Sequence, residues 1–433
     1  MKKVLIITYY WPPASGPGVQ RWLKFVKYLP EFGWKPLILT VKDGSYPATD
    51  DSLSKDVPND IPVFKTNTLE PFTIYNMLRG KKGKKVEPGL SSIKDKKGSF
   101  YQKIAAYIRA NFFIPDARIG WRSYAVKEVK KILETHKIDV IVTTSPPHSA
   151  QLIGLDLKKK HNIPWVADFR DPWVNIYSNQ LLNLNDRVKQ KNIEYENKVL
   201  TSSDKVLVVG DSMRTEFSDR NSNVHVLYNG FDPTDLSEAP IEATNTFTLR
   251  YVGKISPLQN IPNLWKAINE LRLANEDFNK YFRISFVGMT SKPIQNSITE
   301  ADLLPICTFS SFVPHQEAVR KMMCANMLLL VIPNTPKNEC IITGKIFEYL
   351  ASQTPILGVG PTNGDAAIVL QKCKRDSMID FEDLAGFKKM LLTHFNYWLE
   401  HQKYSLKNKN DLHLQFSRRK LTKGLATLLD KLA

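Results

Sequence analysis

Residues 343–351 read Thr-Gly-Lys-Ile-Phe-Glu-Tyr-Leu-Ala, and residues 354–357 read Thr-Pro-Ile-Leu. This pattern predicts that a glycine and a lysine enter a helix, that Glu348 lies one turn later, and that a buried strand follows. The unpaired N–H groups at a helix N-terminus favour phosphate, Gly344 would let it approach the backbone, and Lys345 would add a charge. Glu348 could accept hydrogen bonds from a ribose. A glutamate in the first turn also offsets the helix dipole, so capping accounts for part of the pattern.

Outward from this stretch, short β-rich runs alternate with helical segments along the whole chain. In the second half we expect strands at Leu249–Val252, Arg283–Val287, Met327–Ile332 and Pro355–Gly358. In the first half we expect strands at Val4–Thr8, Lys35–Leu39, Val63–Thr66, Val140–Thr144, Val166–Phe169, Lys205–Val209 and Val224–Tyr228. This alternation is typical of α/β domains in which helices flank doubly wound parallel sheets.

The length of 433 residues favours more than one domain. A turn cluster at residues 229–233 and a polar stretch at Ser237–Asn245 mark a linker. We therefore expect an N-terminal domain over residues 1–235, a second domain over residues 246–405, and a C-terminal helix over residues 406–433 that could pack back on the first domain. Open α/β sheets bind ligands at the carboxyl ends of their strands, so both halves can face a central cleft.

The composition is that of a globular protein with a strong basic excess, 60 Lys and Arg against 43 Asp and Glu. This charge suits nucleic acid, an anionic membrane surface or phosphorylated substrates. The four cysteines have no metal-ligand spacing and indicate reduced thiols, which fits a cytoplasmic protein. The apolar run after Met1 is too short for a signal peptide, and no run of about 20 apolar residues would span a membrane.

A basic insertion at about residues 79–103 breaks the α/β rhythm, and residues 101–113 follow it with apolar side chains at helical spacing. A solvated loop with a core-packed helix explains this region as well as an interfacial element that binds anionic lipid. The second interpretation would make the protein peripheral on the inner face of the membrane.

The stretch at residues 343–351 resembles the signature of glycosyltransferase family 4, whose members have the GT-B fold of two Rossmann-like domains. The family motif has two glutamates with seven residues between them. Here eight residues separate Glu339 from Glu348, so only Glu348 matches and the part of Glu339 stays open. In the segment 251–260 the family places two cations that face the diphosphate, whereas this sequence has Lys254 and Gln259. The resemblance implies that the donor is bound by Gly253, Gly344, Ile346 and Glu348, with Lys254 and Lys345 as catalytic cations.

In the first half, the loop at residues 11–21 resembles the family's glycine-rich loop, so Gly16 and Gly18 would lie against the donor phosphates and Arg21 would face the acceptor. A plain strand-to-helix turn explains these glycines almost as well. Two further segments, at residues 145–149 and 168–173, follow predicted strands. There we expect His148 and Arg170 to serve catalysis and Asp168 and Asp171 to bind the acceptor, although a buried Asp–Arg pair would explain the second segment too.

The resemblance implies a retaining transferase that moves a sugar from a nucleotide diphosphate sugar to an acceptor hydroxyl of a cell-surface polysaccharide or glycolipid. The sequence has no Asp-x-Asp motif after a strand, so we expect neither a metal nor another cofactor; cations and backbone N–H groups would neutralise the leaving diphosphate. An inactive sugar-nucleotide-binding protein and an epimerase on the same fold are the alternatives. A nucleic-acid-binding protein fits less well because the basic residues gather in one insertion and no recognition fold is readable.

Overall fold

The computed structural model describes residues 1–46, 48–70, 107, 110–176, 179, 182–236, 245–401, 406–407 and 410–433. These residues form two compact units, one of Met1–Asn229 with Arg418–Ala433 and one of Gly230–Ser417. The predicted basic insertion lies outside the described residues, as does most of the segment 101–113. No helix among the described residues is long and apolar enough to cross a membrane.

The N-terminal unit contains a parallel sheet of seven strands in the order β3-β2-β1-β4-β5-β6-β7. The strands are β1 (Lys2–Ile7), β2 (Trp34–Val41), β3 (Val63–Thr66), β4 (Val140–Ser145), β5 (Trp165–Phe169), β6 (Lys205–Val208) and β7 (Val224–Val226). Most are runs of aliphatic residues because helices cover both faces of the sheet. The strand order reverses between β1 and β4, and the carboxyl ends of strands at such a reversal are where open α/β sheets bind ligands.

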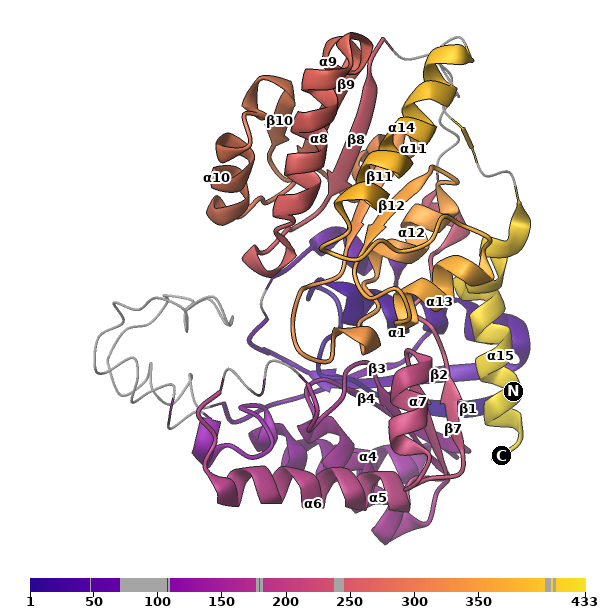
Figure 1. Ribbon diagram of the computed structural model, residues 1–433. Coiled ribbons are helices and arrows are strands. Elements are labelled where there is room, and N and C mark those ends of the chain that lie inside the picture. Colours follow the sequence, from indigo (N-terminus) through magenta and orange to yellow (C-terminus); the bar gives the residue numbers. More distant parts are fainter. Residues whose placement is uncertain are drawn as a thin grey trace. The chain divides into compact units, whose positions relative to one another are not determined.

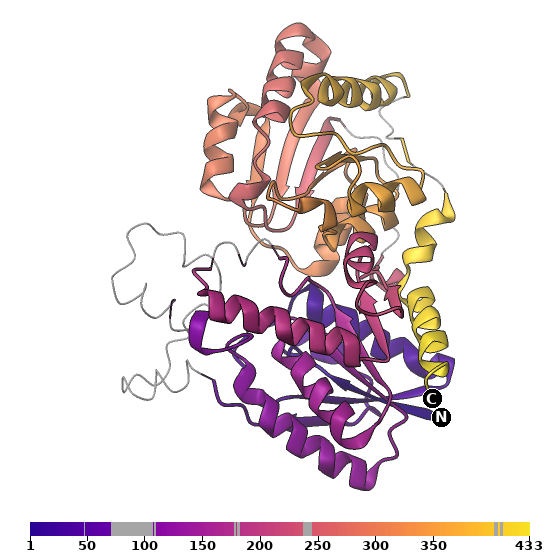
Figure 2. The ribbon, with the colours of Figure 1, turned by 60° about the horizontal axis from the view of Figure 1, so that its bottom comes forward.

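Helices cover the two faces of this sheet. One face packs on α4 (Arg122–Thr135), α5 (Ser149–His161), α6 (Asp186–Ser202) and α7 (Asp211–Phe217). The other face packs on α1 (Pro17–Tyr28) and on α15 (Arg418–Asp430), whose Leu425 and Leu429 share a core cluster with Val4 and Ile6 of β1. The last helix of the chain therefore completes the first sheet, and the two termini lie close together in Figure 1 and Figure 2.

The C-terminal unit contains a parallel sheet of five strands in the order β10-β9-β8-β11-β12. The strands are β8 (Phe247–Val252), β9 (Phe282–Val287), β10 (Cys307–Ser310), β11 (Met327–Val331) and β12 (Ile356–Val359). The helices are α8 (Pro262–Ala274), α9 (Glu276–Tyr281), α10 (Lys292–Glu300), α11 (His315–Met323), α12 (Lys345–Ala351), α13 (Asp365–Lys372) and α14 (Leu384–Glu400). Here the order reverses between β8 and β11, so the expected binding edge follows these two strands.

The prediction of two doubly wound parallel sheets is confirmed. The sequence did not predict β10, an edge strand whose residues Cys-Thr-Phe-Ser are mostly exposed and form no apolar run. It also did not predict α9, α10 and α13. The expected C-terminal helix over residues 406–433 is shorter, because Asp411–Phe416 is a 3-10 helix and α15 spans Arg418–Asp430.

Candidate active site

The glycine-rich loop after β1 lies against Arg170, which follows β5. A Cβ atom added to Gly18 would lie 1.4 Å from Nη1 of Arg170, so the guanidinium occupies the room that the sequence assigned to a ligand. Gly16 has a φ of +117° and no atom within 4 Å of its Cβ position. The open space of this loop is therefore at Gly16, and Gly18 makes room for the arginine.

The guanidinium of Arg170 donates hydrogen bonds to two backbone carbonyl oxygens. Its Nε donates to the carbonyl of Ser145 at 3.1 Å, and Nη2 donates to the carbonyl of Pro146. Burial lowers the pKa of Arg170, opposed by Asp171 and Asp168, and burial raises the pKa of Asp171. The first turn of α1 carries no acidic residue. The positive end of this helix and a buried guanidinium thus meet at Gly18, an arrangement that favours an anion nearby.

Arg21 and Asp168 form a buried pair below this loop. Nη2 of Arg21 lies 2.7 Å from Oδ1 of Asp168, and neither side chain is exposed. Asp168 Oδ2 also accepts from Trp22 Nε1 at 2.8 Å and from Thr144 Oγ1 at 2.7 Å. Arg21 Nη1 donates to the carbonyl of Leu227 at 2.8 Å. The two residues predicted to contact the acceptor are therefore enclosed, and they tie α1, β4, β5 and the end of β7 together.

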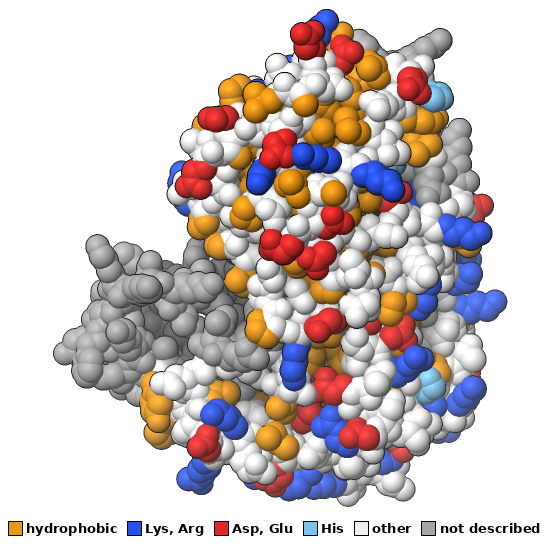
Figure 3. Space-filling view, in the orientation of Figure 1, with side chains coloured by type: hydrophobic (Ala, Val, Ile, Leu, Met, Phe, Trp, Pro, Cys, Tyr) orange, Lys and Arg blue, Asp and Glu red, His pale blue; other side chains and the backbone are white. Residues whose placement is uncertain are grey.

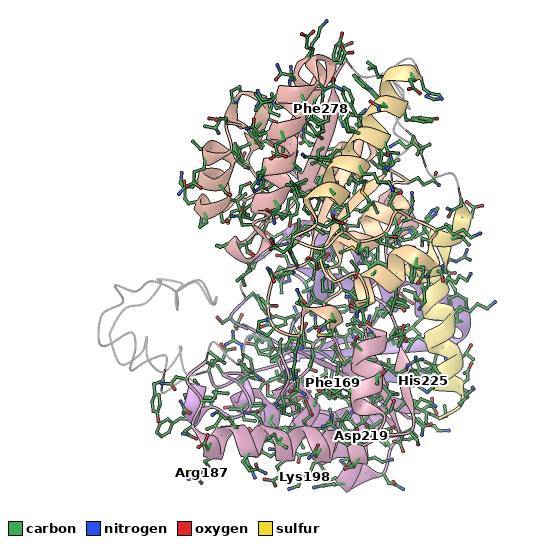
Figure 4. The ribbon with its side chains drawn as sticks, viewed as in Figure 1. Phe169, Arg187, Lys198, Asp219, His225 and Phe278 are labelled. Carbon is green, nitrogen blue, oxygen red and sulfur yellow. The ribbon has the colours of Figure 1, made fainter. Side chains whose placement is uncertain are left out.

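His148 lies at the carboxyl end of β4, next to aromatic rings. It stacks on Trp173 with a centroid distance of 4.9 Å, and the ring of Phe169, labelled in Figure 4, lies at 6.4 Å. Burial, followed by the charge of Arg170, lowers the pKa of His148 to about 3. The ring is neutral near pH 7, and its buried Nδ1 has no hydrogen-bond partner among the described residues. A neutral imidazole can accept a hydrogen bond at one of its ring nitrogens, but it has no imidazolium proton to give to a substrate near pH 7.

The sequence missed a second buried cluster at this edge. Glu70 follows β3; its Oε2 lies 2.6 Å from Nη1 of Arg118, and its Oε1 accepts from the hydroxyl of Tyr9. Asp116 accepts from the backbone N and the Oγ of Ser149, both at 2.9 Å, at the start of α5, where the N-cap residue His148 makes no capping hydrogen bond with its side chain. Burial raises the pKa of Glu70 and of Asp116. The only trace of this cluster in the sequence is the Asp-Ala-Arg of residues 116–118. It was not predicted as a site because it does not follow a predicted strand.

In the C-terminal unit, Lys345 reaches the turn after β8. A Cβ atom at Gly253, whose φ is +111°, would lie 2.7 Å from Cε and 3.3 Å from Nζ of Lys345. The ammonium group also lies 5.3 Å from the ring centroid of Tyr251. Two stretches far apart in the sequence thus meet at the strand-order reversal, and they bring a glycine turn and a lysine together.

Lys254 and Gln259 have different surroundings. Lys254 is exposed and forms no ion pair with any described residue. Gln259 is buried: its Nε2 donates to the carbonyl of Val331 at 2.9 Å, and its Oε1 accepts from the backbone N of Ser256 at 3.0 Å. The position where the family has a second cation is therefore a structural glutamine that ties the loop to β11.

The helix of the opening motif is α12, which begins after Gly344. Glu348 is half-buried in its first turn, whereas Glu339 is exposed. Ile346, predicted to bind the donor, is fully buried and its N–H donates to the carbonyl of Thr343 at 3.2 Å, so it offers a ligand no group in this structure. Oγ1 of Thr343 is buried with no hydrogen-bond partner among the described residues, and the sequence did not point to it.

No group of three or more His, Cys, Asp or Glu side chains suited to a metal ion occurs in the described ranges. A groove of about 570 Å³ lies between α4 and α5, and none of the predicted site residues lines it. Each unit therefore has its own set of candidate site residues, which lie at the strand-order reversal of its sheet.

The N-terminal part of the sequence, residues 73–235, matches the model of Glycosyltransferase Family 4. No curated protein sequence matches the chain. Among solved structures, the chain resembles sucrose-phosphate synthase from Thermosynechococcus elongatus (TM-score 0.62, 12% identity, covering 100% of this chain and 99% of that one). It also resembles a glycosyltransferase from Rickettsia africae (TM-score 0.61, 13% identity, 100% and 98%) and TarM (TM-score 0.64, 10% identity, 99% and 99%). At these identities the likeness shows the fold, which is GT-B.

Proposed function

We propose that the chain is a family 4 glycosyltransferase that transfers a sugar from a nucleotide sugar, and that the acceptor is a hydroxyl of a cell-surface polysaccharide or glycolipid; the family match over residues 73–235 and the GT-B fold support this proposal. We further propose that the reaction retains the anomeric configuration and needs no metal. The proposed donor site rests on one observation: the side chain of Lys345 lies next to Gly253 at the strand-order reversal of the C-terminal unit.

The donor diphosphate would bind against Gly253 and against Gly344, the N-cap residue of α12. Lys345 and the exposed Lys254 would neutralise the charge that develops on the leaving diphosphate, because preorganised cations stabilise such charge more than water does. Thr343 could donate its unpaired hydroxyl to the same oxygens. Glu348 would accept hydrogen bonds from the ribose hydroxyls.

The N-terminal unit would supply the acceptor side. Arg170 and the first turn of α1 place positive potential beside the open space at Gly16, which suits a phosphate oxygen. His148 would accept a hydrogen bond from a substrate hydroxyl. Arg21 and Asp168 would act as positioning residues that hold the strand ends, and Asp171 would balance Arg170.

The donor site is tested by calorimetry with nucleoside diphosphates of uridine, guanosine, adenosine and cytidine. For the diphosphate that binds best, Lys345→Ala should weaken affinity about tenfold or more, because a charge-assisted hydrogen bond is lost. The matched control is Lys292→Ala, an exposed lysine of the same unit that hydrogen-bonds Gln295. Equal affinity of both variants would remove Lys345 from the site.

The ribose assignment is tested separately. Glu348→Ala should weaken binding of the nucleotide sugar, and Glu339→Ala is the comparison because the part of this residue is open. Lys254→Ala should lower turnover with little change in unfolding free energy. Turnover that persists in excess chelator is expected for a metal-independent reaction, and its loss would contradict that part of the proposal.

The same assays separate the alternatives. An inactive sugar-nucleotide-binding protein would bind the donor without hydrolysing it or transferring its sugar to a lipid-linked acceptor. An epimerase would change the sugar without releasing the diphosphate. The proposed place of action is the cytoplasm, at the inner face of the membrane.

A further inference from the structure

The groove between α4 and α5 lies outside the sites described so far. Its volume of about 570 Å³ is within the usual range for small-molecule sites. α4 leads into β4, and α5 leads from β4 into β5, so the two helices pack side by side and run in the same direction. The groove is formed by these helices and by the 3-10 helix Ile119–Trp121, all within the N-terminal unit.

Helical spacing brings basic side chains together in this groove. Lys127 and Lys130 of α4 are three residues apart, so they lie on one face of the helix. Lys160 and His161 line the groove from the last turn of α5. All four side chains are exposed, and none of the three lysines forms an ion pair or a hydrogen bond within the described part of the chain.

The acidic side chain in the groove is already paired. Nε and Nη2 of Arg122 donate to the two carboxylate oxygens of Asp156, both at 2.7 Å. Lys160 follows Asp156 at the spacing of a helical ion pair, but the arginine already balances this carboxylate. Glu134, four residues after Lys130, is exposed and does not line the groove. The charge of the three lysines is therefore not compensated within the groove.

The neighbouring helix α6 has a different arrangement of charges. Its Glu194 pairs with Lys191 at 2.9 Å and also with Lys198, and its Asp186 pairs with Lys189 at 3.0 Å. Basic and acidic side chains are likewise interspersed over the face of the molecule in Figure 3. Compared with α6, the groove has lysines that lack such acidic partners, so its local charge favours an anion.

Apolar side chains lie between these lysines and the core of the unit. Ile119 and Val126 line the groove, are half-buried and pack against the core cluster of the sheet. Ser123 adds an exposed hydroxyl that can donate a hydrogen bond. The groove thus combines N–H and O–H donors with apolar surface, which suits a molecule that has an anionic group and an apolar part.

We propose that this groove binds a phosphate ester, with the phosphate at the three lysines and the apolar part of the ester against Ile119 and Val126. Ammonium groups form charge-assisted hydrogen bonds with phosphate oxygens, and a phosphate monoester carries up to about two negative charges. The groove shares no residue with the proposed donor and acceptor sites, so it is a second site. A soluble phosphate ester and a phospholipid headgroup present the same group, and the experiment distinguishes them.

The imidazole signal of His161 reports on this groove, because His161 lines it and is exposed. The test follows this signal by NMR in protein labelled on its histidines, with His161→Gln to assign it. Octyl phosphate, below its micellar concentration, should shift the signal in a saturable way. It should bind about tenfold or more tightly than inorganic phosphate, because only the ester buries apolar surface. Octyl glucoside has the same chain without the charge and should not shift the signal.

A triple variant tests the lysines. The groove variant should weaken octyl phosphate binding about tenfold or more, since charge-assisted hydrogen bonds are lost; it combines Lys127→Gln, Lys130→Gln and Lys160→Gln. The control variant on α6 removes the same number of charges from the same unit and should leave the affinity unchanged; it combines Lys189→Gln, Lys191→Gln and Lys198→Gln.

Ser123→Glu is a single substitution that adds a negative charge to the groove. A carboxylate in the first turn of α4 favours the helix, so the variant should fold. Its charge opposes a bound phosphate and should weaken octyl phosphate binding about threefold or more.

Flotation with phosphatidylglycerol vesicles, against phosphatidylcholine vesicles, identifies the source of the phosphate. Weaker binding to the anionic vesicles in the groove variant than in the α6 variant supports the site with a phospholipid headgroup as ligand. Equal vesicle binding of the two variants, together with lysine-dependent binding of octyl phosphate, supports the site with a soluble ester. Lys345→Ala should leave the His161 response intact, so failure of the donor proposal does not affect this test.

Two results would overturn the proposal. One is a His161 response that stays linear in octyl phosphate or that octyl glucoside reproduces. The other is an equal affinity of the groove variant and the α6 variant for octyl phosphate, which would mean that only the net charge of the chain matters.

Discussion

The absence of a side chain at Gly18 leaves room for the charged guanidinium of Arg170. The guanidinium of Arg170 lies where a Cβ of residue 18 would be. Its hydrogen bonds to the carbonyls of Ser145 and Pro146 fix it in this position. Any larger residue must displace the guanidinium or the start of α1. The requirement for glycine at Gly18 is therefore steric, because its φ lies outside the left-handed region that Gly16 occupies with a φ of +117°.

Gly18→Ala should lower the unfolding free energy by about 1–3 kcal/mol, the usual cost of overpacking, and should lower turnover because Arg170 moves. Urea denaturation measures the first effect. The control is Gly424→Ala in α15, where an added Cβ meets no atom within 4 Å. That substitution should be neutral or stabilising by up to about 1 kcal/mol, because alanine favours helix. Equal unfolding free energies of the two variants would mean that Arg170 can move away from residue 18 without destabilising the folded chain.

The lowered pKa of His148 makes the stability of the folded chain depend on pH. Its folded pKa of about 3 lies below the unfolded value of about 6.5, so the unfolded chain binds the proton more readily. The stability that the neutral ring contributes is fully present above pH 6.5 and is lost as the pH falls from there toward 3. The group is also uncharged throughout the neutral range.

His148→Gln should therefore flatten the acid side of the stability profile. Between pH 6.5 and 4.5 the native chain should lose roughly 1–3 kcal/mol more unfolding free energy than this variant, since one pKa unit corresponds to about 1.4 kcal/mol. Urea titrations at a series of pH values measure the difference. His161→Gln, which changes an exposed histidine, is the control, and a native profile parallel to that of His148→Gln would contradict the lowered pKa.

At the scale of elements, α15 packs on a sheet from which it is distant in sequence, as the prediction that the C-terminal helix could pack back on the first domain allowed. Its residues come after the C-terminal unit, yet Leu425, Ala426 and Leu429 are buried against the first sheet. The ion pair of Lys2 with Asp430 joins the first strand to the last helix at 3.1 Å. Because this pair is exposed, apolar burial supplies most of the attachment.

Leu429→Ala should destabilise the N-terminal unit by about 2–4 kcal/mol, because it removes a buried side chain and leaves a cavity. Lys423→Ala, on the exposed side of the same helix, should change stability by less than about 0.5 kcal/mol. Hydrogen exchange of the β1 and β2 amides gives the local readout. Unchanged exchange in Leu429→Ala would show that α15 contributes little to this sheet.

At the scale of the whole molecule, the basic excess has more than one location. Part of it lies in the segment at residues 79–103, outside the described residues, and part lies along α15, which carries Arg418, Arg419, Lys420 and Lys423. The net charge of +17 therefore favours anionic surfaces as partners in addition to anionic substrates.

Deleting residues 80–98 should reduce binding to anionic vesicles at low salt, where electrostatic attraction is strongest. Replacing Lys81, Lys82, Lys84 and Lys85 by glutamine should reproduce most of the loss if charge is the cause. Co-sedimentation at low and high salt measures both. Vesicle binding that survives the deletion would make the segment a spacer.

The sequence alone determined the two doubly wound sheets, because buried parallel strands require aliphatic runs and their crossovers require helical periods. It also led to the prediction of Gly253, Lys345 and Glu348 as donor-site residues, because glycine and charged residues next to predicted strand or helix ends can be recognised from the sequence. Only the tertiary structure decided that Gln259 is buried, that Gly18 accommodates Arg170, and that Asp168 is enclosed by Arg21, Trp22 and Thr144. The physical reason is that burial and pairing depend on neighbours distant along the chain, whereas local patterns report only periodicity and residue type.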